Sequence, residues 1–267
     1  MFENINFEDL DFSKTDLSYS LFKNCNFIKM KFISCNLESS SFIGSYISDS
    51  NFFGSNMKHA DFSESNIVNS KLEKVDLTMA TIAESEIIDC VISNSILELI
   101  NLSELDLKGL DFTGSDLRFA NLTRSDLCGS KLSNTIFTKA NMLKICLNGA
   151  DLNEADMNSA NLWGAELHSA DLSEADLSRA CLRDTDLSSA FLNNSILRFA
   201  DLSGADLTGS DLSGADLTGS NFSGTNINGT IFEKTMMNNT VRDTPPLNDP
   251  FLHEEDRPEA QDKNTFP

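Results

Sequence analysis

One apolar side chain recurs at every fifth position of this sequence. The series begins at Phe2 and runs to Met237, and each of its positions holds leucine, isoleucine, phenylalanine or methionine. These limits give 48 repeats of five residues, and the frame never slips, so no loop is inserted between the first repeat and the last. Because a fixed short period is the signature of repeat architectures, the chain is limited to an elongated stack of equivalent units.

An α-helix cannot use a period of five. Successive residues of a helix are about 100° apart, so apolar positions at this spacing would scatter around it. In an extended segment, the apolar position, which we call i, shares a face with i−2, while i−1 faces the opposite way. Position i−2 is mostly Ala, Ser, Thr or Cys, and i−1 is often Asp or Asn. The pattern predicts short strands with two inward side chains and one outward polar side chain each.

The two remaining positions, i+1 and i+2, must turn the chain. All 13 glycines stand at i+2, where a tight turn can require unusual backbone dihedrals. Asp and Asn at i−1 can accept hydrogen bonds from nearby backbone amides, which gives their preference for this position a structural cause. The sequence therefore predicts an all-β chain of alternating short strands and turns.

The repeated motif A(D/N)LxX resembles that of the pentapeptide-repeat family. Its clearest stretch reads ADLSGADLTGSDLSGADLTGSNF, from Ala200 to Phe222. The resemblance implies a right-handed quadrilateral parallel β-helix with four repeats in each coil. On that basis the 48 repeats make about 12 coils, and the rod is about 58 Å long at the usual spacing of strands. Residues twenty apart should stack, so the phenylalanines of the first coils should form aromatic ladders.

Residues 1–240 form the predicted repeat domain. From Val241 the periodicity stops, and residues 241–267 hold all five prolines and an excess of acidic residues. We interpret 241–267 as an acidic, proline-rich tail that is largely disordered. A second role open to its first part is to cover the last coil, because solenoids need covered ends. The sequence does not indicate how the N-terminal end is covered.

Three consecutive repeats break the small-residue rule at i−2. They hold Ile100, Leu105 and Leu110 at a position where most repeats have a small residue. Extra volume inside the rod should widen or kink it at this point. The sequence leaves open whether the result is a hinge, a bulge or a repacked coil.

The chain is strongly acidic, with 20 Lys and Arg against 41 Asp and Glu and a formal net charge of −21. Such a surface repels nucleic acid and attracts basic surfaces, so we expect no direct nucleic-acid binding. No apolar run is long enough for a membrane span and no leader precedes the repeats, so we expect a cytoplasmic protein without a membrane contact. The six cysteines show no metal-type pairing and are interpreted as small apolar residues in a reducing compartment.

No residue pattern indicates catalysis, a metal site or a cofactor. The many carboxylates follow from the i−1 preference, and the three histidines, His59, His168 and His253, are far apart. A rod filled with its own side chains should also lack the concave, water-excluding site that catalysis needs. We therefore expect a protein that is not an enzyme.

Bulky apolar residues at outward positions form the candidate partner-binding site. Met79, Leu99 and Phe119 occupy i+2 on one predicted face of three successive coils, and Ile96 and Ile136 occupy i−1 nearby. A contiguous exposed ladder of this kind is typical of a contact surface. The first hypothesis is a scaffold that binds a protein partner of unknown identity through its outer faces.

The family resemblance implies a second hypothesis, a DNA mimic that modulates a type II topoisomerase such as DNA gyrase and protects it from quinolones or toxins. Without the tail, which has seven acidic and three basic residues, the rod keeps a net charge of −17. That is about one charge per 3.4 Å of predicted length, half the density of duplex DNA. The candidate acidic face wraps one coil without a compensating base and consists of Asp201, Asp206, Asp211 and Asp216.

Two departures from family members with this activity weaken the second hypothesis. The resemblance implies that members with this activity are dimers joined through a C-terminal α-helical module, often with projecting loops. This chain has a proline-rich tail in that place and a frame without loops. A homodimer is left open, and topoisomerase binding stays the alternative to the scaffold.

Overall fold

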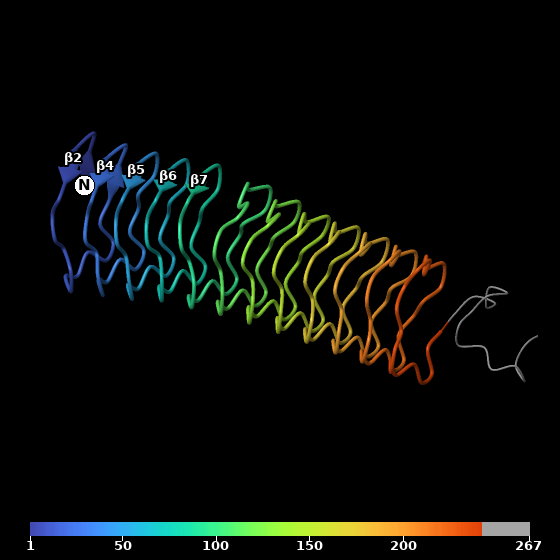
Figure 1. The fold of residues 1–267 in the computed structure, drawn as a ribbon. Helices are drawn as coiled ribbons and strands as arrows, with labels where there is room; N and C mark the ends of the chain where they lie inside the picture. The colour runs from blue at the N-terminus through green and yellow to red at the C-terminus, as the bar shows by residue number, and fades with distance from the viewer. Residues whose placement is uncertain (242–267) are drawn as a thin grey trace, which may run out of the picture.

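The computed structural model describes residues 1–241 as one column of stacked coils (Figure 1). Backbone pairing joins each coil to the next at a spacing of twenty residues, from Phe2 with Phe22 to Asn221 with Val241, and every pairing is parallel. At this spacing residues 2–241 make twelve coils. The predicted parallel β-helix without inserted loops is confirmed. The predicted tail, apart from Val241, lies outside the described residues.

Seven short segments of the described residues are strands, and they lie in the first five coils. They are β1 (Phe2–Glu3), β2 (Asn6–Glu8), β3 (Phe22–Lys23), β4 (Asn26–Ile28), β5 (Tyr46–Ser48), β6 (Asn66–Val68) and β7 (Glu86–Ile88). β1 pairs with β3, and β2, β4, β5, β6 and β7 stack in that order into a five-stranded sheet. We call the side of the rod that carries this sheet the β2 face; in later coils it continues through the repeats centred on residues 107 to 227. The described residues include no helix that could span a membrane.

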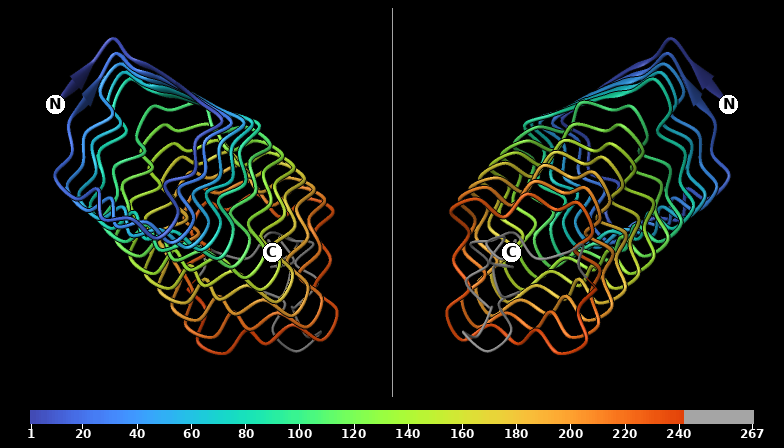
Figure 2. Two further views of the ribbon diagram at one scale, coloured as in Figure 1. Left: turned by 90° about the vertical axis from the view of Figure 1, so that its left-hand side faces the viewer. Right: turned by 90° about the vertical axis from the view of Figure 1, so that its right-hand side faces the viewer.

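Each coil has four sides because each repeat ends in a turn (Figure 2). Position i+2 adopts a positive φ in every repeat from Asn4 to Asn239. Glycine adopts this conformation without a steric penalty, which explains the placement of the glycines. Many other residues adopt it as well, Leu99 at 61° among them, so the stacking of the coils imposes the turn even where the local sequence disfavours it.

The i−1 side chains hold these turns in place. The Oδ1 atom of Asp201 accepts the amide of Ser203 at 3.1 Å, and that of Asp206 accepts the amide of Thr208 at 2.9 Å. The same bond between the i+1 amide and the i−1 side chain recurs along the rod. The structural cause expected for the i−1 preference is confirmed.

The interior is filled by the side chains at i and i−2. Phe2, Phe22, Phe42 and Phe62 form one stack, with ring centroids 5.4, 5.2 and 4.9 Å apart in that order. A second aromatic column begins at Phe12 and has centroid spacings of 5.7 and 4.7 Å. The predicted aromatic ladders of the first coils are therefore confirmed.

Beyond β7 the path of the coils along the β2 face changes, from open arches to sharper corners (Figure 1). No bridge joins β7 to Asp106 in the next coil, although the sides before and after this point remain paired. The interruption falls on the repeat that has the half-buried Leu105 at i−2. Ile100 and Leu110 are fully buried, and their repeats pair with the preceding coil. The expected widening therefore occurs on one side of the rod, at Leu105.

Candidate functional site

The candidate partner-binding surface is the Phe119 corner, which we define as Met79, Leu99 and Phe119. The three residues follow one edge of the rod on successive coils, about 4.8 Å apart. The amide of Leu99 donates to the carbonyl of Arg118 in the next coil at 3.0 Å, so the backbone beneath the corner is continuous. The three side chains are 47, 45 and 44% exposed, which makes them one contiguous apolar surface.

The backbone conformation of the Phe119 corner is costly for such residues. Met79, Leu99 and Phe119 have φ values of 56°, 61° and 59°. Bulky side chains disfavour this left-handed region, and side chains that are half exposed regain little through packing. Residues that cost the fold stability and face solvent point to a role outside the fold.

Charged side chains border the corner. The Nζ atom of Lys139 lies 5.6 Å from the ring centroid of Phe119. Arg118 pairs with Asp116 at 2.7 Å and reaches Glu98 at 3.7 Å. An apolar centre with a polar rim is the usual arrangement of a protein interface.

The two isoleucines predicted to extend this surface are not equivalent. Ile96 belongs to the same repeat as Leu99 and is 42% exposed, whereas Ile136 is half buried. Bridges join Ile96 to Asp116 and Asp116 to Ile136, so a paired carboxylate lies between the two. Ile96 therefore extends the Phe119 corner, and Ile136 is separated from it.

The expectation of an acidic ring without a compensating base is wrong. The Nη1 atom of Arg183 lies 3.9 Å from Asp201, and Arg198 pairs with Asp216, which is only 5% exposed. Both arginines belong to the preceding coil, eighteen residues earlier. They reach the ring because i+1 of one coil lies beside i−1 of the next.

The charge of Asp216 makes stability depend on pH. Burial raises the pKa of Asp216, but hydrogen bonds from Thr218 and Arg198 outweigh it and hold the pKa below the ordinary 3.8. The ionised carboxylate therefore stabilises the fold at neutral pH, and this contribution is lost as the pH falls from about 4 through the folded-state pKa. We expect Asp216→Asn to lower the Tm most at pH 7 and progressively less below pH 4, as measured by thermal unfolding. A Tm difference between Asp216→Asn and wild type that stays constant with pH would contradict this prediction. Glu154→Gln, at an exposed turn position, is the control.

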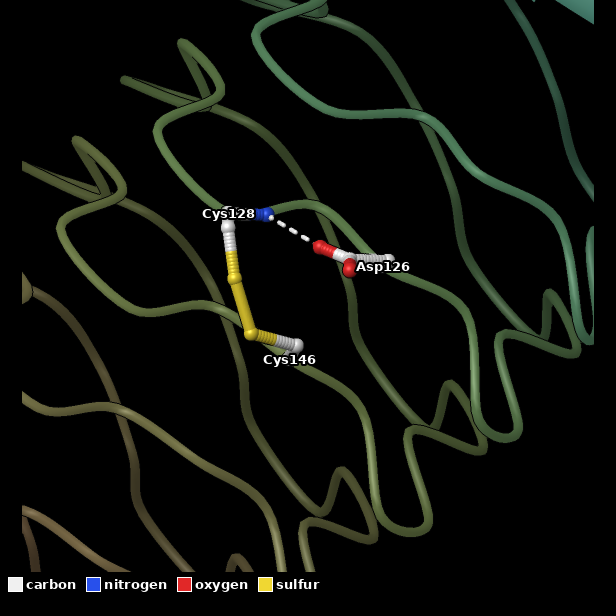
Figure 3. Close-up of side chains that lie close together, drawn as sticks. All are labelled: Asp126, Cys128 and Cys146. Carbon is white, nitrogen blue, oxygen red and sulfur yellow. Dashed lines mark hydrogen bonds between the residues drawn. A yellow bond between two sulfur atoms is a disulfide. The ribbon is translucent and has the colours of Figure 1, made fainter.

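Two of the six cysteines also differ from their interpretation as small apolar residues. Cys128 and Cys146 form a disulfide on the β2 face, with their Cα atoms 5.6 Å apart (Figure 3). Cys128 stands at i+1 and Cys146 at i−1 of the next coil, the same relation that pairs Arg198 with Asp216.

Three of the other cysteines are as predicted. Cys25, Cys35 and Cys90 are buried at i−2 with free thiols. Burial raises the pKa of the Cys90 thiol to about 11, so this thiol stays protonated and unreactive at neutral pH.

The disulfide lies beside a carboxylate, which raises the question of a metal site. Ligand atoms of Asp126, Cys128 and Cys146 lie within 4.8 Å of one another, and Asp126 accepts the amide of Cys128 at 3.1 Å. In the disulfide the sulfurs cannot act as thiolate ligands. The carboxylate of Asp126 also forms an ion pair with Lys108, with 3.0 Å between Oδ2 and Nζ. The arrangement is therefore a cross-link between coils.

Loss of this cross-link is expected to lower thermal stability. The disulfide joins residues eighteen apart, and closing a loop of this size stabilises a fold by about 3 kcal/mol in the chain-entropy model. We expect the Cys128→Ser variant and the reduced protein to share a Tm several degrees below that of the oxidised protein. Cys181→Ser serves as the control, and equal Tm values with and without reductant would contradict the prediction.

The rod also has a concave feature, which corrects the expectation that it would have none. A notch of about 410 Å³ lies between β7 and the next coil, lined by residues 85–89 on one side and by Asp106 and Lys108 on the other. The notch coincides with the interrupted pairing at Leu105. Sequence reasoning placed the irregularity correctly but not the opening that it makes.

Two family models match the sequence. The model described as pentapeptide repeats (8 copies) matches residues 115–153, 150–188 and 195–233. The model described as a pentapeptide repeat region matches residues 1–72, so together the matches span more than half of the chain. Among curated proteins, none matches the sequence significantly.

Several solved structures of similar chains are pentapeptide repeat proteins. HetL from the cyanobacterium Nostoc sp. strain PCC 7120, involved in heterocyst differentiation regulation, is 24% identical over 88% of each chain, with a TM-score of 0.35. A second pentapeptide repeat protein from Nostoc PCC 7120 is 39% identical over 36% of this chain and 78% of its own, with a TM-score of 0.22. Full-length QnrB1, a plasmid-mediated fluoroquinolone resistance protein, is 17% identical over 82% of this chain and 92% of its own, with a TM-score of 0.29. At these TM-scores the comparisons carry no functional argument.

Proposed function

The chain belongs to the pentapeptide-repeat family, and from this premise we propose that it is a non-enzymatic scaffold that binds a protein partner through the Phe119 corner. Its coils stack in constant register, so outward side chains stand at fixed spacings and the backbone that carries them needs no ordering when a partner binds. The observation that carries the proposal is the exposed apolar run of Met79, Leu99 and Phe119 in left-handed backbone positions.

The composition of the surface defines the chemistry of the partner. The apolar centre of the corner fits an apolar groove, and the charges of Arg118 and Lys139 stand at its rim. The formal net charge of −21 repels nucleic acid and speeds the approach of basic surfaces. A protein with an apolar groove is the expected partner.

A DNA mimic that acts on a type II topoisomerase is the second candidate function. The net acidic charge supports it. Against it, Asp216 is buried beside Arg198 and Asp201 faces Arg183, which leaves Asp206 and Asp211 as the outward carboxylates of the predicted ring. We therefore rank the Phe119 corner above the acidic ring.

Capture of the partner by immobilised protein, over a salt series, tests the proposal. Apolar contacts are not screened by salt, so a complex formed through the Phe119 corner should persist as the salt concentration rises. The same complex should be lost when the corner residues are replaced. Inhibition of DNA gyrase supercoiling that weakens steeply with salt and survives the corner replacements would support the DNA mimic instead.

A further inference from the structure

The edge of β7 that faces the next coil is unpaired. At the equivalent place one coil earlier, the amide of Asn69 donates to the carbonyl of Ile88 at 2.9 Å. The corresponding amide of Asp89 makes no such bond. Three further backbone groups also lack the bonds to the next coil that the equivalent groups of the preceding coil make. They are the amide of Ile87, the carbonyl of Ile87 and the carbonyl of Ser85. Two donors and two acceptors therefore lie on an open strand edge.

Leu105 stands in the next coil where the three preceding coils of this face have a hydroxyl. In earlier coils of this face, the side-chain hydroxyl at i−2 accepts a hydrogen bond from the backbone amide at i−2 of the preceding coil. The amide of Cys25 donates to Ser45 Oγ at 3.1 Å, and the amide of Ser65 donates to Ser85 Oγ at 3.3 Å. The amide of Ser85 would need a hydroxyl at position 105. Leucine offers no acceptor there.

The opening is large enough for part of a peptide. Its volume of about 410 Å³ lies within the range of ligand-binding clefts. A small apolar void, lined in part by Ile82, Ile87 and Leu102, adjoins it inside the rod.

The surroundings of the notch are acidic. Its exposed carboxylates are Glu84, Glu86, Asp89, Glu104 and Asp106. The one lysine in the notch lining, Lys108, is paired with Asp106 at 3.4 Å and with Asp126 at 3.0 Å. An occupant with basic side chains therefore complements the notch.

We propose that the notch binds an extended, basic peptide segment of a partner protein, which pairs with the open edge of β7. Addition of a strand to a sheet edge is a recurrent mode of peptide recognition, and the donors and acceptors of Ser85, Ile87 and Asp89 supply its hydrogen bonds. The open edge available to the peptide is short, because pairing between the coils resumes at Val91. Ile88, which is 45% exposed, offers an apolar contact beside the strand. This second binding site is on a different side of the rod from the Phe119 corner.

The test uses the full chain and a fluorescent peptide of alternating lysine and valine as the probe. Binding is followed by fluorescence anisotropy, and amide hydrogen exchange is measured at Ile87 and Asp89. We expect fast exchange of both amides in the free protein and at least tenfold slower exchange with the peptide bound. A peptide of the same charge with every backbone amide methylated, which cannot donate a hydrogen bond from either edge, should bind at least tenfold more weakly.

The matched protein variant is Leu105→Ser, whose new hydroxyl restores the acceptor for the Ser85 amide. We expect this variant to pair β7 with the next coil, to protect the amides of Ile87 and Asp89 without peptide, and to lose peptide binding. Equal binding of the methylated peptide, or no binding of the unmodified one, would overturn the proposal. Capture by the Phe119 corner should be the same in Leu105→Ser and wild type, so the two binding sites can fail independently.

Discussion

Replacing Phe42 with alanine is expected to lower the free energy of unfolding by about 3 to 5 kcal/mol. Phe42 is fully buried, and its ring stacks between those of Phe22 and Phe62 at 5.2 and 4.9 Å. The backbone ladders fix the distance between coils, so the surrounding side chains cannot collapse into the space left by the ring. Chemical denaturation followed by circular dichroism measures the effect.

Two variants serve as controls for Phe42→Ala. Leucine occupies the equivalent position in later coils, at Leu162 for example, so Phe42→Leu should cost clearly less. Phe191 is 52% exposed, and Phe191→Ala should leave stability almost unchanged. A loss below about 1 kcal/mol for Phe42→Ala would show that the aromatic stack does not support the first coils.

The second large effect is expected on binding and not on stability. Replacing Met79, Leu99 and Phe119 together with glycine should abolish partner capture, since a single interface hot spot contributes about 2 kcal/mol, or about thirtyfold in Kd. Glycine adopts the left-handed backbone conformation of these positions without strain, which offsets the greater freedom that it gives the unfolded chain. The Tm of the triple variant should therefore stay close to that of wild type.

The matched control carries three glycines at the same turn position on another edge of the rod. Asn134, Glu154 and Glu174 have φ values of 58°, 57° and 62°, close to those of the Phe119 corner. Their replacement should have a similar effect on Tm and leave capture intact. If both triple variants retain the partner, the Phe119 corner is not its binding site.

The fold could be predicted because each repeat carries the same local information. Position i holds an apolar side chain and i+2 a left-handed turn in all 48 repeats, and i−2 holds a small residue in most of them. The aromatic ladders follow from the same frame once four repeats make a coil. Even the irregular coil was visible, because Ile100, Leu105 and Leu110 break the small-residue rule in three consecutive repeats.

The features that were missed depend on contacts between coils. Arg198 pairs with Asp216, and Cys128 bonds to Cys146, because eighteen residues separate i+1 from the i−1 position that lies beside it in the next coil. A search of the sequence for complementary residues at that spacing would have found both pairs. It would not have found the notch at β7, because that opening depends on the distance between two backbones in adjacent coils.

The sequence by itself determined the strand and turn pattern, the composition of the interior and the constancy of the register, since these follow from a periodicity that every repeat shares. Only the tertiary structure decided which outward groups meet. It buried Asp216, joined two cysteines, isolated Ile136 from Ile96 and opened the edge of β7. The reason is that local preferences act within five residues, whereas the neighbours of an outward side chain come from adjacent coils and are set by stacking.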